Sequence, residues 1–145
     1  MVTTMRIKHA LIVLLACVPL TAQAARFQRF GHDEVHYNIV PTGTLQPEIA
    51  RRYHITRSRQ RGLLTVAILR DGDPVRADVT ATATDLNQQV REIDMREVRE
   101  GQAIYYIGTF RANDGERLKF RITADTRRPD TDPYVIRFMQ HFYAQ

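Results

Sequence analysis

The regular alternation of apolar and polar residues is the feature that most constrains how this chain folds. The segment 75–84 reads VRADVTATAT, with valine or alanine at every second position from Val75 to Ala83. The segments 34–40 and 117–123 alternate in the same way. Successive side chains of a β-strand point to opposite faces, so this period predicts strands that are buried on one face. Helical periodicity is scarce, and we therefore expect a mainly β protein.

Turn sequences divide the chain into seven expected strands. Two of the segments, 62–69 and 103–110, are apolar on both faces, as central strands are. RDGDP at 70–74 and ANDGE at 112–116 are rich in residues that favour turns. Short strands with turns between them are typical of an immunoglobulin-like antiparallel β-sandwich. The expected strands are 34–40, 62–69, 75–84, 90–98, 103–110, 117–123 and 134–143.

One short helix is expected over residues 47–53, where it would close one end of the sandwich. Pro47 suits the first turn, because its missing N–H would have no partner there. Glu48 near the start and Arg51 and Arg52 near the end complement the helix dipole. The alternation also predicts the core, which we expect to contain Leu64, Val66, Ile68, Val79, Ile104, Tyr106, Phe110, Phe120, Ile122 and Phe138.

Residues 1–24 have the features of a secretory signal peptide. Arg6 and Lys8 precede the apolar segment 10–20, which is too short to span a bilayer. TAQA follows, and its small residues predict cleavage between Ala24 and Ala25. The remaining chain, 25–145, is expected to form a single domain in the periplasm without a transmembrane segment.

Cys17 leaves an alternative localisation open. LLAC resembles a lipobox, in which Cys17 would carry a lipid and anchor the protein. Leu15 is bulky where a small residue is preferred, and the apolar run continues to Leu20, so we favour a cysteine that only fills the signal. Since Cys17 is the only cysteine, the exported domain would then have no disulfide.

The charge of the exported domain argues against nucleic-acid binding. The whole chain has 21 basic and 16 acidic residues and a net charge of +5. Arg6 and Lys8 belong to the signal, so the domain keeps a net charge of only +3. A nucleic-acid reader usually carries a stronger bias gathered on one face, and export removes most nucleic acid from reach.

Two long segments of the chain resemble a known family. VHYNIVPTGTLQPEIARRYHITRSRQRGLLTVAIL and REVREGQAIYYIGTF are similar to small exported proteobacterial proteins known only as domain of unknown function 4426. The matching features are Tyr37-Asn38, Pro47-Glu48, Arg57-Ser58, Arg61 to Leu64 and Arg99 to Phe110, and the resemblance extends over about residues 27–143. It implies export and fold but no activity. DGDPVRADVTATATD also resembles immunoglobulin-like domains of exported accessory proteins, which again bears on fold alone.

HDEVH at 32–36 is the best candidate for metal binding. On an extended strand His32, Glu34 and His36 would share one face, and imidazole and carboxylate are ligands for zinc or copper. His54 and His141 are further possible ligands. A stable site needs more ligands held by a supporting shell, so we expect these residues to be an ordinary outward face, with no metal and no cofactor. Metal handling is the alternative function.

The sequence gives little support for catalysis, and we expect a protein that is not an enzyme. Ser58 is the only serine, and it lies outside a G-x-S-x-G motif. The acidic pairs Glu97 with Glu100 and Asp130 with Asp132 lie at polar strand ends or in a loop, where solvated carboxylates are usual. A hydrolase of an unrecognised type is the weaker alternative.

The segment TRSRQRGLL at 56–64 provides the candidate binding surface. On an extended chain Arg57, Arg59 and Arg61 would present three guanidinium groups on one side. Such groups recognise carboxylates and phosphates, so the stripe predicts an anionic envelope component or another periplasmic protein as partner. The alternative is a solvated approach to a buried strand, neutralised by Glu97 or Glu100.

The last strand offers a second, weaker interaction surface. The segment 134–143 ends in Phe142 and Tyr143, and an exposed edge there would pair with a partner strand. The alternative is a buried last strand. The sequence leaves the oligomeric state open.

Overall fold

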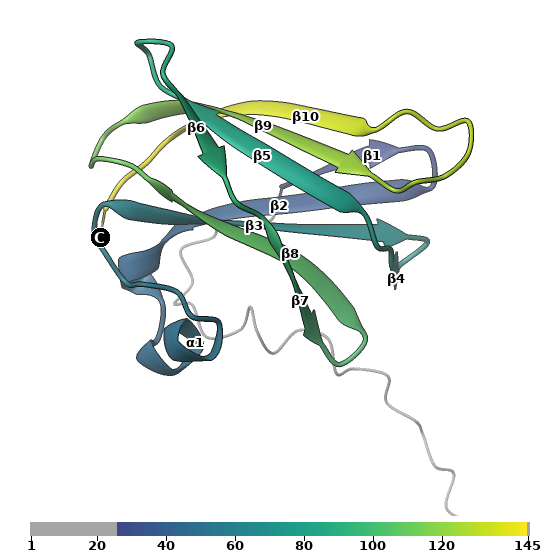
Figure 1. Cartoon of the computed structure of the whole chain (residues 1–145), viewed down its shortest axis with the longest axis horizontal. Helices are drawn as coiled ribbons and strands as arrows, with labels where there is room; N and C mark the ends of the chain where they lie inside the picture. The colour runs from purple at the N-terminus through teal and green to yellow at the C-terminus, as the bar shows by residue number, and fades with distance from the viewer. Residues whose placement is uncertain (1–25, 145) are drawn as a thin grey trace, which may run out of the picture.

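Two antiparallel sheets packed face to face make up the computed structural model, which describes residues 26–144 (Figure 1). The larger sheet has the order β1-β2-β3-β8-β7, and the two-residue strand β4 pairs with β3. The smaller sheet has the order β10-β9-β5-β6. The fold is therefore the all-β sandwich that the alternation predicts. The bounds of the larger sheet are β1 (Arg26–Phe30), β2 (Asp33–Pro41), β3 (Arg61–Arg70), β4 (Asp73–Pro74), β7 (Arg96–Glu100) and β8 (Ala103–Arg111); those of the smaller are β5 (Asp78–Thr84), β6 (Val90–Ile93), β9 (Arg117–Asp125) and β10 (Tyr134–His141).

The core lies between the two sheets, and its residues confirm which face of each strand was expected to point inward. Seven of the ten expected core residues are buried: Leu64, Val66, Ile68, Tyr106, Phe110, Phe120 and Ile122. The other three, Val79, Ile104 and Phe138, are partly buried and pack against this cluster. The ring of Phe120 stacks on Phe138 at 5.0 Å and meets the edge of Phe110 at 5.1 Å. These aromatic contacts join strands of both sheets.

The expected strand 90–98 is in fact two strands in different sheets. β6 ends at Ile93 and β7 begins at Arg96, so the chain crosses from the smaller to the larger sheet at residues 94–95. Gly108 on β8 makes room for this crossing. A Cβ there would come within 2.7 Å of the Asp94 carbonyl oxygen and the Met95 sulfur. Close backbone approach of this kind is a common reason for glycine in a strand.

Two strands, β1 and the two-residue β4, were not expected, and the bounds of β5 and β10 need correction. β1 was not expected, because four of its five residues are exposed and it has no apolar face. β5 starts at Asp78 and not at Val75, although Val75 and Ala77 still pack against the core. β10 ends at His141 and is an edge strand.

The expected helix is present as α1 (Pro47–Arg52), which follows a 3-10 turn η1 (Thr42–Thr44) (Figure 1). Ala50, Tyr53 and Ile55 form a second apolar cluster with Leu63 and Ile107. Leu63 and Ile107 point away from the main core, so α1 and the residues after it cover the outer face of β3 and β8.

The expected signal peptide, its cleavage point and Cys17 lie outside the described residues. Within residues 26–144, no helix is both long and apolar enough to cross a bilayer.

Candidate functional site

The arginine stripe expected from the sequence does not lie along a strand. Residues 55–60 form a loop and a turn, and β3 begins only at Arg61. Thr42 fixes this loop, since its Oγ1 donates to the Ser58 carbonyl at 3.1 Å and accepts from the Ser58 N–H at 2.9 Å. Arg57 donates to the Gly43 carbonyl at 3.0 Å, and Arg59 is exposed. The three arginines therefore do not lie on one extended strand, although the sequence predicts that they do.

Arg61 instead faces a second arginine across the sheet. It lies directly opposite Arg111 in the antiparallel pairing of β3 with β8. In the part of the chain that the structure describes, neither side chain has a carboxylate within 4.0 Å. Like charges directly opposite each other in a sheet are destabilising. The fold therefore holds two positive charges together at the end of the sandwich without neutralising them.

A cavity of about 410 Å³ lies beside this arginine pair. Its lining includes a third guanidinium and several neutral polar groups, and it has no His, Cys, Asp or Glu: Ser58, Gln60, Arg61, Arg91, Arg111, Ala112 and Asn113. The Ser58 hydroxyl accepts the Gln60 N–H at 3.1 Å. The three guanidinium groups and the neutral polar side chains of the cavity suit it to binding an anion.

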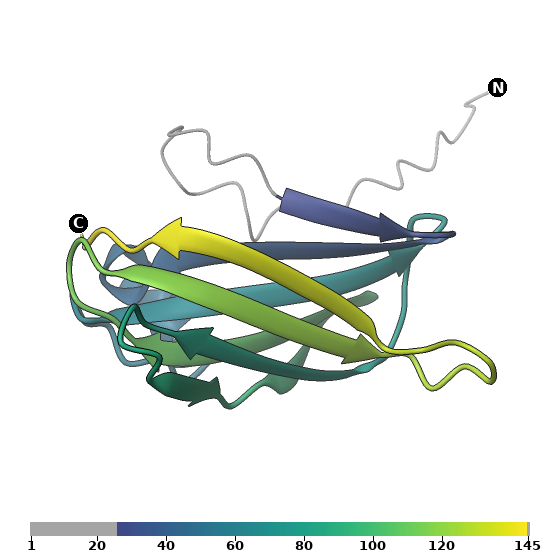
Figure 2. The same cartoon turned by 90° about the horizontal axis from the view of Figure 1, so that it is seen from above.

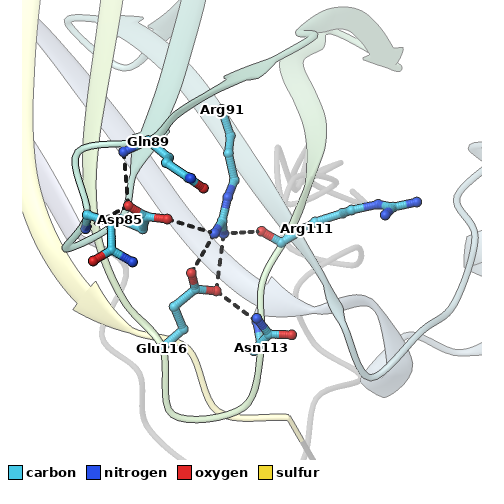
Figure 3. Close-up of polar contacts among 7 residues, drawn as sticks. Asp85, Gln89, Arg91, Arg111, Asn113 and Glu116 are labelled. Carbon is cyan, nitrogen blue, oxygen red and sulfur yellow. Dashed lines mark hydrogen bonds and ion pairs between the residues drawn. The ribbon is translucent and has the colours of Figure 1, made fainter.

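Arg91 is the fixed member of the three arginines (Figure 3). Its guanidinium donates to both carboxylate oxygens of Glu116, at 2.6 and 3.1 Å, and to the Arg111 carbonyl at 2.8 Å. Asp85 accepts from the same group at 3.3 Å. The hydrogen bond from Arg91 lowers the pKa of Glu116, and the same bond raises the pKa of Arg91. The two carboxylates neutralise Arg91, whereas the side chain of Arg111 points away from this network in Figure 3.

Glu97 and Glu100, expected to neutralise the stripe, pair elsewhere. Glu97 accepts from Arg76 and Arg99, both at 3.1 Å, and Glu100 lies 3.9 Å from Arg52. They provide no counter-charge for the arginine pair at the end of the sandwich.

The structure brings together only part of the metal-ligand candidate. His36 Nε2 lies 3.0 Å from Glu34 Oε2 on β2, and the His36 ring stacks on Phe27 at 5.2 Å. Glu34 is also ion-paired with Arg29, whose hydrogen bond, followed by that of His36, lowers the pKa of Glu34. His32 lies in the turn before β2, 3.5 Å from Asp71, so it does not share the strand face as expected.

Over residues 26–144, no three His, Cys, Asp or Glu side chains come together as a metal site.

A buried ion pair between β2 and β3 was missed at the level of sequence. Asp33 is fully buried and accepts two hydrogen bonds from Arg70, at 2.7 and 3.0 Å. The hydroxyl of Tyr134, from the other sheet, donates to Asp33 at 2.7 Å. The alternation itself offers a signal: Asp33 precedes Val35 by two residues and so belongs on the inner face, where a carboxylate needs partners. This triad ties the two sheets together.

Residues 27–145 match the family described as domain of unknown function DUF4426. No curated protein matches this chain in sequence. The crystal structure of a DUF4426 family protein from Pseudomonas aeruginosa PAO1 has 32% identity and a TM-score of 0.74. The alignment covers 85% of this chain and 98% of that one.

Two solved structures of FetP from uropathogenic E. coli strain F11 are similar in fold. The protein as isolated, after expression in the periplasm, has 8% identity and a TM-score of 0.61, over 84% of this chain and 95% of that one. A copper-bound variant has 9% identity and the same TM-score, over 84% and 97%. At this identity the likeness bears on fold alone.

Proposed function

Since this chain belongs to the DUF4426 family, whose function is unknown, we propose that it is a non-catalytic binding module of the periplasm that recognises an anionic group at the Arg61–Arg111 pair. The anionic group is a carboxylate or phosphate on another envelope component. Export rests on the signal-like residues 1–24, and the FetP likeness is compatible with the same compartment.

The observation that carries this proposal is the pair of opposed arginines, which has no carboxylate partner among residues 26–144. Arg61 and Arg111 occupy partner positions on two central strands, beside a cavity of about 410 Å³. An anion between them would remove their repulsion and accept charge-assisted hydrogen bonds from both. Amide side chains of Gln60 and Asn113 line the same cavity and add neutral donors.

Arg91 lines the same cavity and is held there by its own ion pairs. Glu116 and Asp85 hold its guanidinium, so it does not need the ligand to be neutralised. A fixed, already paired arginine shapes the cavity, and the two unpaired arginines supply the net positive charge. Preorganised groups of this kind lose little entropy when the ligand binds.

Titration calorimetry at low salt with inorganic phosphate, and separately with glutarate, tests the proposal. The double variant Arg61→Gln/Arg111→Gln is expected to lose at least tenfold in affinity, since two charge-assisted contacts are removed. The matched control Arg57→Gln/Arg59→Gln makes the same change in charge in the neighbouring loop and is expected to bind within twofold of wild type. Equal losses in both variants, or no loss in the first, would show that the pair is not the site.

A metal-handling role is the second candidate, and the contact between Glu34 and His36 favours it. A FetP variant of similar fold binds copper, but at 9% identity that likeness shows the fold alone. Arg29 weakens the case, because its positive charge beside Glu34 opposes a cation. Elemental analysis after dialysis separates the two roles: about one copper or zinc per chain, lost in His36→Ala but kept in Arg61→Gln/Arg111→Gln, would favour metal handling.

A further inference from the structure

The outer face of the smaller sheet carries a second group of unpaired cations. β10, β9 and β5 run side by side in Figure 2, and their outward positions are free of any covering element in the described chain. Four exposed basic side chains gather there: Arg117, Lys119, Arg121 and Arg137. None of them has a carboxylate within 4.0 Å among residues 26–144.

The pairing of the strands concentrates these charges. Arg121 lies directly opposite Arg137 across β9 and β10. Glu92 is the acidic residue nearest in register, because it faces Thr82, which in turn faces Arg121. Edge strands commonly carry charges that prevent aggregation, which accounts for Arg137 on β10. β9 is a central strand and needs no such protection, so its three cations require another explanation.

Exposed apolar side chains accompany the cations. Of the five large apolar residues exposed in the described chain, four belong to this sheet or its adjoining ends: Leu86 (66%), Val90 (62%), Met139 (39%) and Tyr143 (60%). Val90 faces Thr84, Thr84 faces Lys119, and Lys119 faces Met139, so one row across the sheet has a cation between two apolar residues.

Tyr143 stacks on His141, whose partner in β9 is Arg117. Leu86 lines a cavity together with Arg117 and His141. The apolar residues are therefore interleaved with the cations on one face.

We propose that this face binds peripherally to an anionic phospholipid bilayer. Basic side chains are attracted to acidic headgroups, and apolar side chains among them enter the interfacial region. A hollow of about 770 Å³ on the face is lined by threonines of β5 that lie beside Lys119 and Arg121 of β9. Threonine hydroxyls and guanidinium groups both donate to phosphate oxygens, so a headgroup phosphate fits between Arg121 and Thr82. This surface lies on the sheet opposite Arg61 and Arg111 and is independent of that site.

Co-sedimentation with vesicles tests the proposal. The full exported protein is mixed with vesicles of phosphatidylcholine alone or with about 30% phosphatidylglycerol, at low and high salt. We expect binding only to the anionic vesicles, and weaker binding at high salt, where charges are screened over a few ångströms. The double variant Arg121→Gln/Arg137→Gln is expected to bind about 25-fold more weakly, which is about fivefold for each cation.

The matched control is Arg57→Gln/Arg59→Gln, which removes the same net charge from the loop before β3, outside both proposed binding surfaces. It is expected to bind anionic vesicles within about twofold of wild type. Met139→Ser tests the apolar contribution and is expected to weaken binding severalfold without changing its salt dependence. Thermal melting establishes that each variant is folded, and their exposed positions predict unchanged melting temperatures.

Three outcomes would overturn the proposal. The first is the absence of vesicle binding by wild type. The second is an equal loss in both arginine variants, which would mean that net charge alone is sensed. The third is wild-type binding to soluble polyglutamate but not to vesicles, which would assign the face to an acidic protein. None of these results bears on phosphate binding at Arg61 and Arg111.

Discussion

Replacing Asp33 with asparagine is expected to destabilise the fold by about 2–3 kcal/mol. Asp33 is fully buried and accepts three hydrogen bonds, two from Arg70 and one from Tyr134. Asparagine keeps the shape but removes the charge, and its amide would present a donor to groups that are themselves donors. Loss of one partner of a buried ion pair costs about 3–5 kcal/mol. The side chain of Arg70 is 34% exposed and regains some hydration, which reduces the expected loss.

The same substitution should change how stability depends on pH. Hydrogen bonds from Arg70 are the largest cause that lowers the pKa of Asp33, and the Tyr134 hydroxyl adds to it against the effect of burial. Because the folded-state pKa lies below the unfolded value of about 3.9, the contribution of Asp33 is fully present near neutral pH. It is lost as the pH falls below about 4 and through the folded-state pKa. This part of the acid dependence should be missing in Asp33→Asn.

Urea unfolding followed by circular dichroism at several pH values measures both effects. Glu48→Gln is the matched control, since it removes a carboxylate of α1 whose side chain is 68% exposed, and it is expected to unfold close to wild type. Tyr134→Phe should produce a smaller loss, of about 1–2 kcal/mol, because only one hydrogen bond to a charged group disappears. A loss below about 1 kcal/mol for Asp33→Asn, or an unchanged acid dependence, would refute the argument that this triad joins the sheets.

The remaining predictions concern the core, a close contact and processing. Phe120→Ala should cost about 3–5 kcal/mol in urea unfolding, because the ring is buried between both sheets. Gly62→Ala should cost about 1–3 kcal/mol, since its Cβ would overlap the Phe110 ring, and Phe110→Leu in the same background should recover part of the loss. N-terminal sequencing of exported protein should find cleavage after Ala24, and a lipid-modified Cys17 at the new terminus would contradict this.

Most of the fold could be predicted from the alternation of apolar and polar residues, since it shows which side chains of each strand point into the core. Leu64, Val66 and Ile68 follow it and are buried as expected. The crossing at Asp94 and Met95 was not predicted, because no glycine or proline interrupts residues 90–98, although their apolar residues are spaced by three, two and three positions. The chain can cross there because Gly108 leaves room for the Asp94 carbonyl and the Met95 sulfur. This contact joins positions far apart in the sequence, so no local pattern indicates it.

The expectation that residues 57–61 are extended was wrong for a related reason, whereas their role in binding stays a prediction. Alternating arginines contain no information on burial, so the period alone does not show that residues 57–61 are extended. The loop conformation is set by two hydrogen bonds between Thr42 and Ser58, which are 16 residues apart. The sequence did predict Arg61 as a binding residue, and this remains a prediction. Its opposition to Arg111 depends on the register of β3 with β8, which local patterns do not fix.

The arginines fall into two groups according to their partners: some pair with carboxylates and stabilise the fold, and others face a second arginine. Arg70 and Arg91 each bind carboxylates that are themselves largely buried, so these pairs satisfy groups that the sandwich encloses. The opposed pairs on the two outer faces have no carboxylate partner within the described chain, and the two arginines of each pair repel each other. A glutamate at position 111 would neutralise Arg61 across the sheet and stabilise the fold. Proteins commonly retain such unfavourable local arrangements where binding requires them, and these pairs are therefore the best guide to partners.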